Sequence, residues 1–176
     1  MVVRHTSFVL ALPLPTSDVG SSCASVHDFS LLVCSGLEPA VVYRFPFLNR
    51  GLTPTHRVEL PRSADFDHVN CACVGDLDFD GRPEIVVGTV GEQLLFYRRV
   101  EAAQNADSGR YELAYRHRMA GPVHSLLYGG DFLGDGLKCV AVLTSQGLHL
   151  LQCSLDFCID LLASRLDSCD AETLIC

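Results

Sequence analysis

A repeat of about 54 residues is the sequence feature that most constrains how this chain can fold. Each copy contains two short apolar runs, and the three copies lie at residues 31–35 and 40–44, residues 85–89 and 94–98, and residues 140–144 and 148–151. A period of this size is typical of solenoids and propellers, in which one repeat cannot bury its own apolar faces and packs on its neighbours.

The two runs of each copy have the sequence pattern of a β-hairpin. They are too short for helices, they are rich in Val, Leu, Ile and aromatic residues, and a turn separates them at residues 36–39, 91–93 and 146–147. We therefore predict an all-β fold, in which residues 1–153 form a partial β-propeller of about three blades.

The segments around the repeats allow further predictions. The apolar run at residues 8–12 is short and is followed by Pro13 and Pro15, so we expect a strand and a turn there rather than a signal peptide. Residues 102–110 are small and polar and predict an exposed loop, whereas residues 111–116 alternate in polarity as an outer strand does.

The end of the chain follows a different pattern. Apolar residues recur there at helical spacing, namely Leu155, Ile159, Leu162 and Leu166. Residues 154–176 are therefore predicted to form a C-terminal amphipathic helix and tail, with the apolar stripe packed on the last blade.

Composition and charge limit the possible functions. The formal net charge is −8, and the basic clusters at residues 98–99 and 116–118 are short, so no nucleic-acid partner is expected. No apolar run approaches the roughly 18 residues that a transmembrane helix needs. The nine cysteines are an odd number without zinc-ligand spacing, which favours a reducing compartment. Those in or beside apolar runs are predicted to be small core residues: Cys34, Cys71, Cys73 and Cys139.

The strongest chemical signal is an acidic loop at residues 76–84, with the sequence DLDFDGRPE. Its carboxylates occupy loop positions 1, 3, 5 and 9 and belong to Asp76, Asp78, Asp80 and Glu84. Calcium prefers about six to eight oxygen ligands, and alternating acids on a tight turn can direct their oxygens to one point. Gly81 would supply the positive φ of the turn and Arg82 a backbone carbonyl, so this loop is a candidate calcium site.

An alternative without metal remains open for this loop. The same acids could form a turn held by Asx-type hydrogen bonds to backbone N–H groups. An EF-hand is disfavoured, because a strand rather than a helix is expected after the loop. The third copy has a related loop at residues 131–139 with two of the four acids, and its Asp131, Asp135 and Gly136 are predicted to form a structural turn.

No catalytic arrangement is evident. Asp76 and Asp78 could form the DxD motif of a metal-dependent glycosyltransferase, but the sequence has no Gly-rich phosphate loop, Gly-x-Ser-x-Gly or His-x-x-x-His motif. His68, His124 and His149 lie in or next to the repeat strands and are interpreted as structural residues. We therefore predict that the protein is not an enzyme.

Residues 75–88, with the sequence GDLDFDGRPEIVVG, resemble the FG-GAP repeat of seven-bladed propellers of the integrin-α type. More narrowly, the acidic loop together with residues 37–44 (LEPAVVYR), 48–52 (LNRGL) and 134–137 (GDGL) resembles the C-terminal half of the kaptin family. The resemblance extends from about Phe8 to Leu155. It implies that further blades lie outside this chain, which would leave two sheet edges open.

The kaptin resemblance implies a cytoplasmic scaffold. It implies membership of KICSTOR, a complex at the lysosomal membrane surface that restrains mTOR signalling during amino-acid or glucose starvation, and association with the actin cytoskeleton. The implied partners are other KICSTOR subunits, including a second FG-GAP propeller protein, and F-actin, and the one cofactor to consider is Ca²⁺. The tail at residues 156–176 departs from the longer basic helix of the family.

A second hypothesis is a calcium-binding extracellular adhesion module of the integrin-α type. The same FG-GAP resemblance supports it. The odd number of cysteines and the expected lack of a signal peptide disfavour it.

Overall fold

The computed structural model describes residues 6–13, 29–35, 38–44, 57–102, 105–156, 159–160 and 162–163. Over these residues the secondary structure is almost entirely β-strand. The strands are β1 (Thr6–Pro13), β2 (Phe29–Ser35), β3 (Val41–Arg44), β4 (Arg57–Glu59), β5 (Val69–Gly75), β6 (Glu84–Thr89), β7 (Gln93–Ala102), β8 (Asn105–Arg118), β9 (Val123–Gly130), β10 (Cys139–Thr144) and β11 (Gly147–Leu151).

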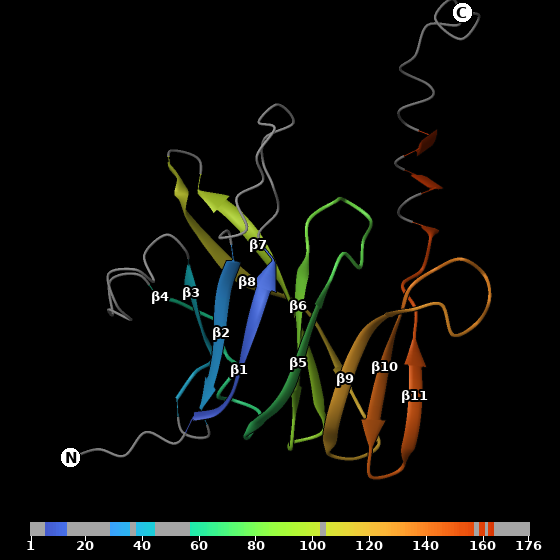
Figure 1. Ribbon diagram of the computed structural model, residues 1–176, viewed down its shortest axis with the longest axis horizontal. Coiled ribbons are helices and arrows are strands. Elements are labelled where there is room, and N and C mark those ends of the chain that lie inside the picture. The colour runs from blue at the N-terminus through green and yellow to red at the C-terminus, as the bar shows by residue number, and fades with distance from the viewer. Residues whose placement is uncertain are drawn as a thin grey trace, which may run out of the picture.

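Three antiparallel sheets contain these strands (Figure 1). The first sheet has the order β1-β2-β3-β4, the second β5-β6-β7-β8 and the third β9-β10-β11. Each sheet is a meander, because every strand pairs with the strand that follows it along the chain. The predicted all-β class is confirmed, and the arrangement fits a partial propeller-like fold.

The three predicted hairpins are β2–β3, β6–β7 and β10–β11. Their registers agree across the repeat, since Leu31 lies opposite Tyr43 in the first sheet and Ile85 lies opposite Tyr97 in the second. Strand β6 is buried at every position, which explains why its central residues, 85–87, are consecutive apolar residues rather than alternating with polar ones.

The second sheet separates two hydrophobic cores. One of its faces contributes Val87 and Leu95 to a first core shared with the first sheet, and its other face contributes Val86 and Leu94 to a second core shared with the third sheet. The first core consists of Leu32, Cys34, Ala40, Val42, Leu60, Val69, Ile85, Val87, Leu95 and Tyr97. The second consists of Cys73, Leu77, Val86, Leu94, Met119, Val123, Leu126, Val140 and Val142. Each repeat is therefore stabilised by burial against its neighbours.

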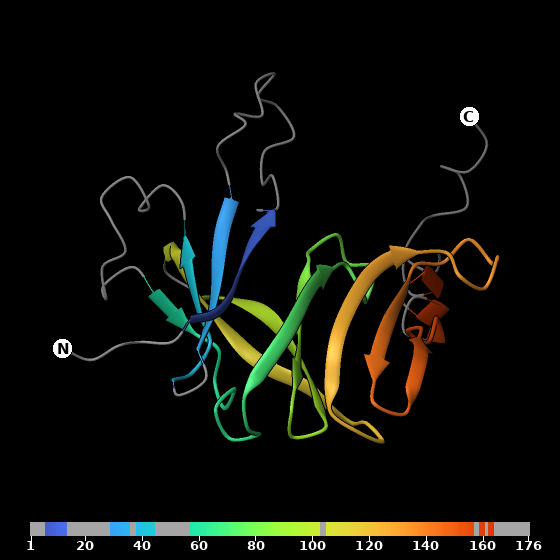
Figure 2. The same ribbon diagram turned by 60° about the horizontal axis from the view of Figure 1, so that its bottom comes forward.

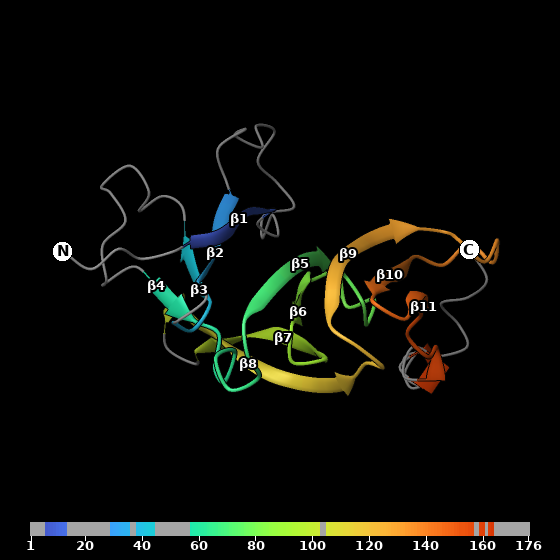
Figure 3. The same cartoon turned by 90° about the horizontal axis from the view of Figure 1, so that it is seen from below.

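The first strands of the three sheets lie next to one another. Strand β5 contacts both β1 and β9, and Figures 2 and 3 show these three strands in succession along one side of the molecule. Strands β4 and β8 lie on the other side and also contact each other. Between β5 and β9, the Asn70 side-chain amide donates to the Val123 carbonyl at 2.9 Å.

The predicted loop at residues 102–110 is wrong for most of its length. Strand β7 extends to Ala102, strand β8 begins at Asn105, and Val100 pairs with Arg110. The small polar residues continue the hairpin because each strand satisfies the backbone hydrogen bonds of the other, whatever their side chains. The predicted outer strand at residues 111–116 is confirmed as part of β8.

The C-terminal segment also differs from the prediction. Ile159 N–H donates to the Leu155 carbonyl at 2.9 Å, which forms a helical turn. The side chains of Leu155, Ile159 and Leu162 are 38%, 59% and 59% exposed, so their predicted packing on the last blade is wrong. The reason is that the segment leaves the third sheet after β11 instead of crossing its face (Figure 1).

Several predictions fall on residues outside the described ranges. These are the turn after Pro13, the family segment at residues 48–52, and the remainder of the C-terminal helix from residue 164 onward. The division into a repeat region at residues 1–153 and a tail at residues 154–176 stays a prediction.

The predicted role of the cysteines is confirmed for the described repeat strands. Cys34, Cys73 and Cys139 are buried with free thiols, and Cys71 is half-buried. Burial raises the pKa of the Cys34, Cys71 and Cys73 thiols to about 12, because a thiolate would lose its hydration there. These three cysteines therefore pack as small apolar residues and are poor nucleophiles at neutral pH.

Candidate metal-binding loop

The acidic loop connects β5 to β6 and is shaped by hydrogen bonds from its own backbone. Gly81 N–H donates to Asp76 Oδ2 at 3.1 Å, Asp80 N–H to Asp78 Oδ1 at 3.1 Å, and Arg82 N–H to Asp80 Oδ1 at 2.7 Å. Gly81 has a φ of 86°, as the sequence predicts. The Asx-type turns of the metal-free interpretation are thus present, and they also fix the positions of the carboxylates.

The loop brings three of the four predicted acids together. Carboxylate oxygens of Asp76, Asp78 and Glu84 all lie within 4.8 Å of one another. Glu84 is 8% exposed, and its Oε2 accepts the Leu77 N–H at 2.8 Å, so it is held from the start of β6. Asp80 is not a member of this group of three.

The electrostatics of the group favour either a proton or a cation. Burial and the neighbouring carboxylates of Asp78, Asp80 and Asp76 raise the pKa of Glu84 to about 7, against the opposing effect of the Leu77 N–H. The pKa of Asp78 is raised as well, chiefly by burial. Both shifts reflect the cost of keeping like charges close together and away from water.

One carboxylate oxygen in the loop lacks a partner. Asp76 Oδ1 is buried and has no hydrogen-bond partner among the described residues. The Asp76 backbone is anchored from the third sheet, because the Tyr128 hydroxyl donates to its carbonyl at 2.6 Å. A buried oxygen without a donor suits a metal ligand, and the all-oxygen donor set of the loop is the kind that calcium prefers.

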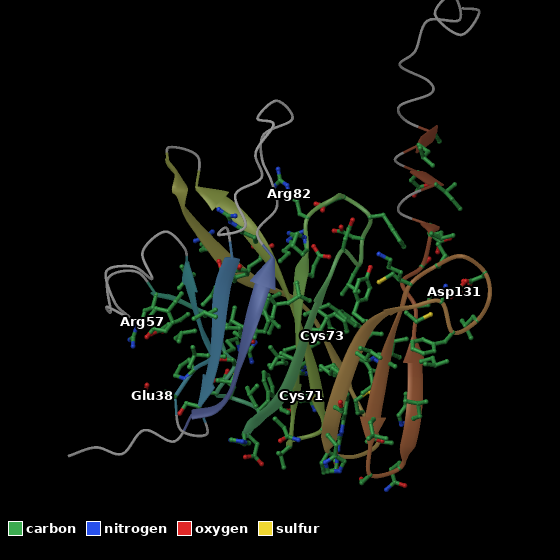
Figure 4. The ribbon with its side chains drawn as sticks, in the orientation of Figure 1. Glu38, Arg57, Cys71, Cys73, Arg82 and Asp131 are labelled. Carbon is green, nitrogen blue, oxygen red and sulfur yellow. The ribbon has the colours of Figure 1, made fainter. Side chains whose placement is uncertain are left out.

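The related loop of the third repeat provides an internal comparison. Gly136 N–H donates to Asp131 Oδ2 at 3.0 Å and Leu137 N–H to Asp135 Oδ1 at 3.0 Å, as at the matching positions of the acidic loop. Here, however, Asp131 Oδ1 accepts the Gly134 N–H at 2.7 Å. The oxygen that lacks a partner at Asp76 is therefore satisfied by backbone in the third repeat. Figure 4 shows Asp131 and Arg82 in loops at the same end of their sheets.

Two site residues were not recognisable from the sequence. Leu77 contributes its backbone N–H to Glu84, and Tyr128 contributes its hydroxyl to the loop from 52 residues away. Spacing within the loop predicts neither contact, because the Leu77 contact is made by the backbone and the Tyr128 contact depends on how the third sheet packs on the second. The proposed role of the Arg82 carbonyl stays a prediction.

The acidic loop borders a cleft of about 690 Å³ between the second and third sheets. The lining includes Asp78 and Glu84 from the loop, together with Phe96, Tyr115 and Leu151 from the two sheets. His149, which was interpreted as structural, has its Nε2 3.1 Å from the Thr144 hydroxyl and so supports the β10–β11 hairpin. None of the helical segments among the described residues has the length and apolar character needed to cross a membrane.

The fold and this loop define a class of β-repeat protein, in which meander sheets pack face to face and an acidic loop follows the first strand of a repeat. The family model described as KICSTOR complex protein kaptin matches residues 11–163. The chain is also 38% identical over 160 residues to the KICSTOR complex protein kaptin of Mus musculus. This alignment covers 91% of this chain and 36% of the mouse protein. The chain belongs to the kaptin family, and it spans little more than a third of the length of that relative.

Proposed function

We propose that this chain is a non-catalytic scaffold that assembles with KICSTOR subunits. The observation that carries the proposal is the family match at residues 11–163, which includes strands β2 to β11 and the end of β1. Among the described residues, the acidic loop is also the one group of His, Cys, Asp or Glu side chains whose ligand atoms converge. In this proposal the chain acts through sheet faces and loops rather than through a reaction centre.

The finer parts of the proposal follow from the family resemblance. The sheets are blades of a seven-bladed FG-GAP propeller, and a second FG-GAP propeller protein is one of the partners. The assembled complex works in the cytoplasm at the lysosomal surface, where it restrains mTOR signalling during nutrient starvation. Association with F-actin is a separate part of the proposal and requires its own sedimentation assay.

Co-purification tests the assembly directly. The tagged chain is co-expressed with the KICSTOR subunits, and we expect these subunits to be captured in stoichiometric amounts. The matched control is Val86→Asp, which places a carboxylate at a position that is 0% exposed in the second core and so disrupts the sheets. The proposal would be contradicted if the native chain captured no subunit. It would also be contradicted if the Val86→Asp control captured as much as the native chain.

We further propose that the acidic loop binds Ca²⁺. The clustered oxygens of Asp76, Asp78 and Glu84 and the unpartnered Asp76 Oδ1 support this function. A bound cation would relieve the repulsion that raises the pKa of Glu84, and it would stabilise the connection between β5 and β6.

Thermal unfolding with and without calcium tests this site. Calcium at a hundred times its Kd should stabilise the fold by about 2.7 kcal/mol, or roughly 5–10 °C in Tm. Asp78→Asn should abolish the rise, whereas Asp135→Asn in the related loop of the third repeat should preserve it. A Tm that neither calcium nor chelator changes would rule out the metal site and would leave the scaffold function unaffected.

A further inference from the structure

Asp76 takes part in two contacts of different kinds. Its carboxylate is one of the three whose oxygens lie within 4.8 Å of one another, and its Oδ1 is buried without a hydrogen-bond partner among the described residues. Its backbone carbonyl accepts a hydrogen bond at 2.6 Å from the hydroxyl of Tyr128, which lies on strand β9 of the third sheet. A residue of the candidate calcium site is therefore held in place from a neighbouring sheet.

The position of the Tyr128 ring is fixed by both sheets. A Cβ atom at Gly75 would overlap the ring, so the ring lies directly on the β5 backbone that leads into Asp76. The Lys138 ammonium, from the related loop of the third repeat, lies 5.9 Å from the ring centroid, within the range of a cation–π contact. Tyr128 also packs against the second core, which joins the second and third sheets. The place of its hydroxyl therefore depends on how the third sheet sits on the second.

The repeat shows that this link is particular to the acidic loop. In the third repeat, the glycine before the loop is Gly130, and a Cβ atom there would overlap the ring of Phe132, which belongs to the loop itself. In strand pairing, Val74 of β5 occupies the position that Tyr128 occupies in β9. Valine has no hydroxyl with which to hold a neighbouring loop. Among the described loops, the acidic one is thus joined to the next sheet by a tyrosine.

We propose that Tyr128 couples the acidic loop to the third sheet, so that Ca²⁺ bound at the loop strengthens the packing of the third sheet on the second. The inference rests on the proposed calcium site and concerns its regulation. A cation held by the Asp76 carboxylate would fix this residue, and with it the carbonyl that accepts the Tyr128 hydroxyl. Coupling between two binding events is reciprocal, so the packed third sheet should raise the affinity for Ca²⁺ by the same factor.

Calorimetric titration of the intact chain with CaCl₂ tests the coupling. Tyr128→Phe removes the hydroxyl and keeps the ring on Gly75, so Ca²⁺ should bind about tenfold more weakly. The matched control is Tyr115→Phe. Tyr115 lines the cleft beside Asp78 and Glu84, but its hydroxyl has no hydrogen-bond partner among the described residues, so this variant should bind Ca²⁺ as the native chain does.

The stability of the same variant gives a second measurement. In urea unfolding, the ratio of the unfolding constants of Tyr128→Phe and the native chain should be about tenfold larger in saturating Ca²⁺ than in chelator, because the hydroxyl contributes more when the loop is fixed. A tyrosine that only packs against the core would give the same ratio in both conditions. If Tyr128→Phe does not fold, as judged by circular dichroism, Gly75→Ala replaces it, since the added methyl group must displace the ring.

The outcomes separate this inference from the calcium site on which it rests. A native chain that binds no Ca²⁺ would overturn both. Equal Ca²⁺ affinity in the native chain and Tyr128→Phe, or a ratio of unfolding constants that Ca²⁺ does not change, would overturn the coupling alone and leave the calcium site in place.

Discussion

Glu84 is the carboxylate of the acidic loop whose charged form is most strongly destabilised by its surroundings. Its side chain is almost fully buried next to two other carboxylates, and its main compensation is the N–H of Leu77. The pKa of about 7 means that, without a cation, this carboxyl is partly protonated near neutral pH. A cation bound to this group would compete with the proton for the same oxygens.

We expect the metal-free protein to lose stability as the pH rises from about 4.5 to 7. In this window the folded chain binds more protons than the unfolded chain, because the pKa of Glu84 is higher in the fold, so the free energy of unfolding falls with pH. The loss should be on the order of 1–3 kcal/mol. Glu84→Gln keeps an acceptor for Leu77 N–H but does not titrate, so its stability should change less over this range.

Urea unfolding in chelator at pH 5 and pH 7.5 measures this difference. Asp131→Asn serves as a control, since it removes an exposed acid of the related third-repeat loop rather than one of the three clustered carboxylates. Parallel pH profiles for the native chain and Glu84→Gln would show that Glu84 is not the group responsible.

At the residue scale, the spacing of the acids was informative because a short turn is determined locally. Alternating acids with Gly81 predict a loop that turns back on itself, and Asp76, Asp78 and Glu84 do converge. The sequence could not show that Asp76 Oδ1 lacks a donor or that Tyr128 anchors the loop. The Tyr128 contact depends on the packing of two sheets, and the unpartnered Asp76 oxygen depends on a loop backbone that differs from that of the third repeat, where the Gly134 N–H donates to Asp131 Oδ1.

At the scale of elements, close approach between β5 and β9 determines how the second and third sheets meet. A Cβ atom at Gly75 would overlap the ring of Tyr128, whose hydroxyl holds the Asp76 carbonyl. Gly75 therefore permits a backbone-to-ring contact that a larger residue would prevent.

Gly75→Ala should destabilise the protein by about 1–3 kcal/mol, because the added methyl group must displace the Tyr128 ring. Equilibrium urea unfolding gives this number. The double-mutant cycle with Tyr128→Leu provides the control, since the cost of Gly75→Ala should shrink once the ring is absent. An equal cost in both backgrounds would contradict the assigned contact.

Some secondary-structure elements could be predicted from the sequence, and others could not. The three hairpins could be predicted from their repeated apolar runs, because strands that pack against a neighbouring sheet carry such residues on at least one face. The extension of β7 and β8 past Val100 and Arg110 could not be predicted, since its stability comes from strand pairing and its composition is that of a loop. The predicted packing of Leu155, Ile159 and Leu162 is wrong, because helical spacing shows that a stripe is apolar but not what it contacts.

At the scale of the whole molecule, each sheet is stabilised by the next one. Residues at equivalent positions of different sheets therefore contribute different amounts to the free energy of unfolding, depending on whether a neighbouring sheet covers them. Leu94→Ala should cost about 2–5 kcal/mol, because it opens a cavity in the second core. Leu148→Ala, at the equivalent position of the third sheet, should change the stability of the monomer by less than about 0.5 kcal/mol. Both values come from unfolding at low protein concentration, and equal costs would contradict the described packing.

Amide hydrogen exchange on the intact chain tests most directly the central claim that consecutive sheets, here the second and third, form one packed unit. The account predicts similar strong protection in β5 and β6 of the second sheet and in β9 and β10 of the third, because the second core joins them. Protection confined to β5–β8, with β9–β11 exchanging at the rate of an unstructured chain, would contradict it.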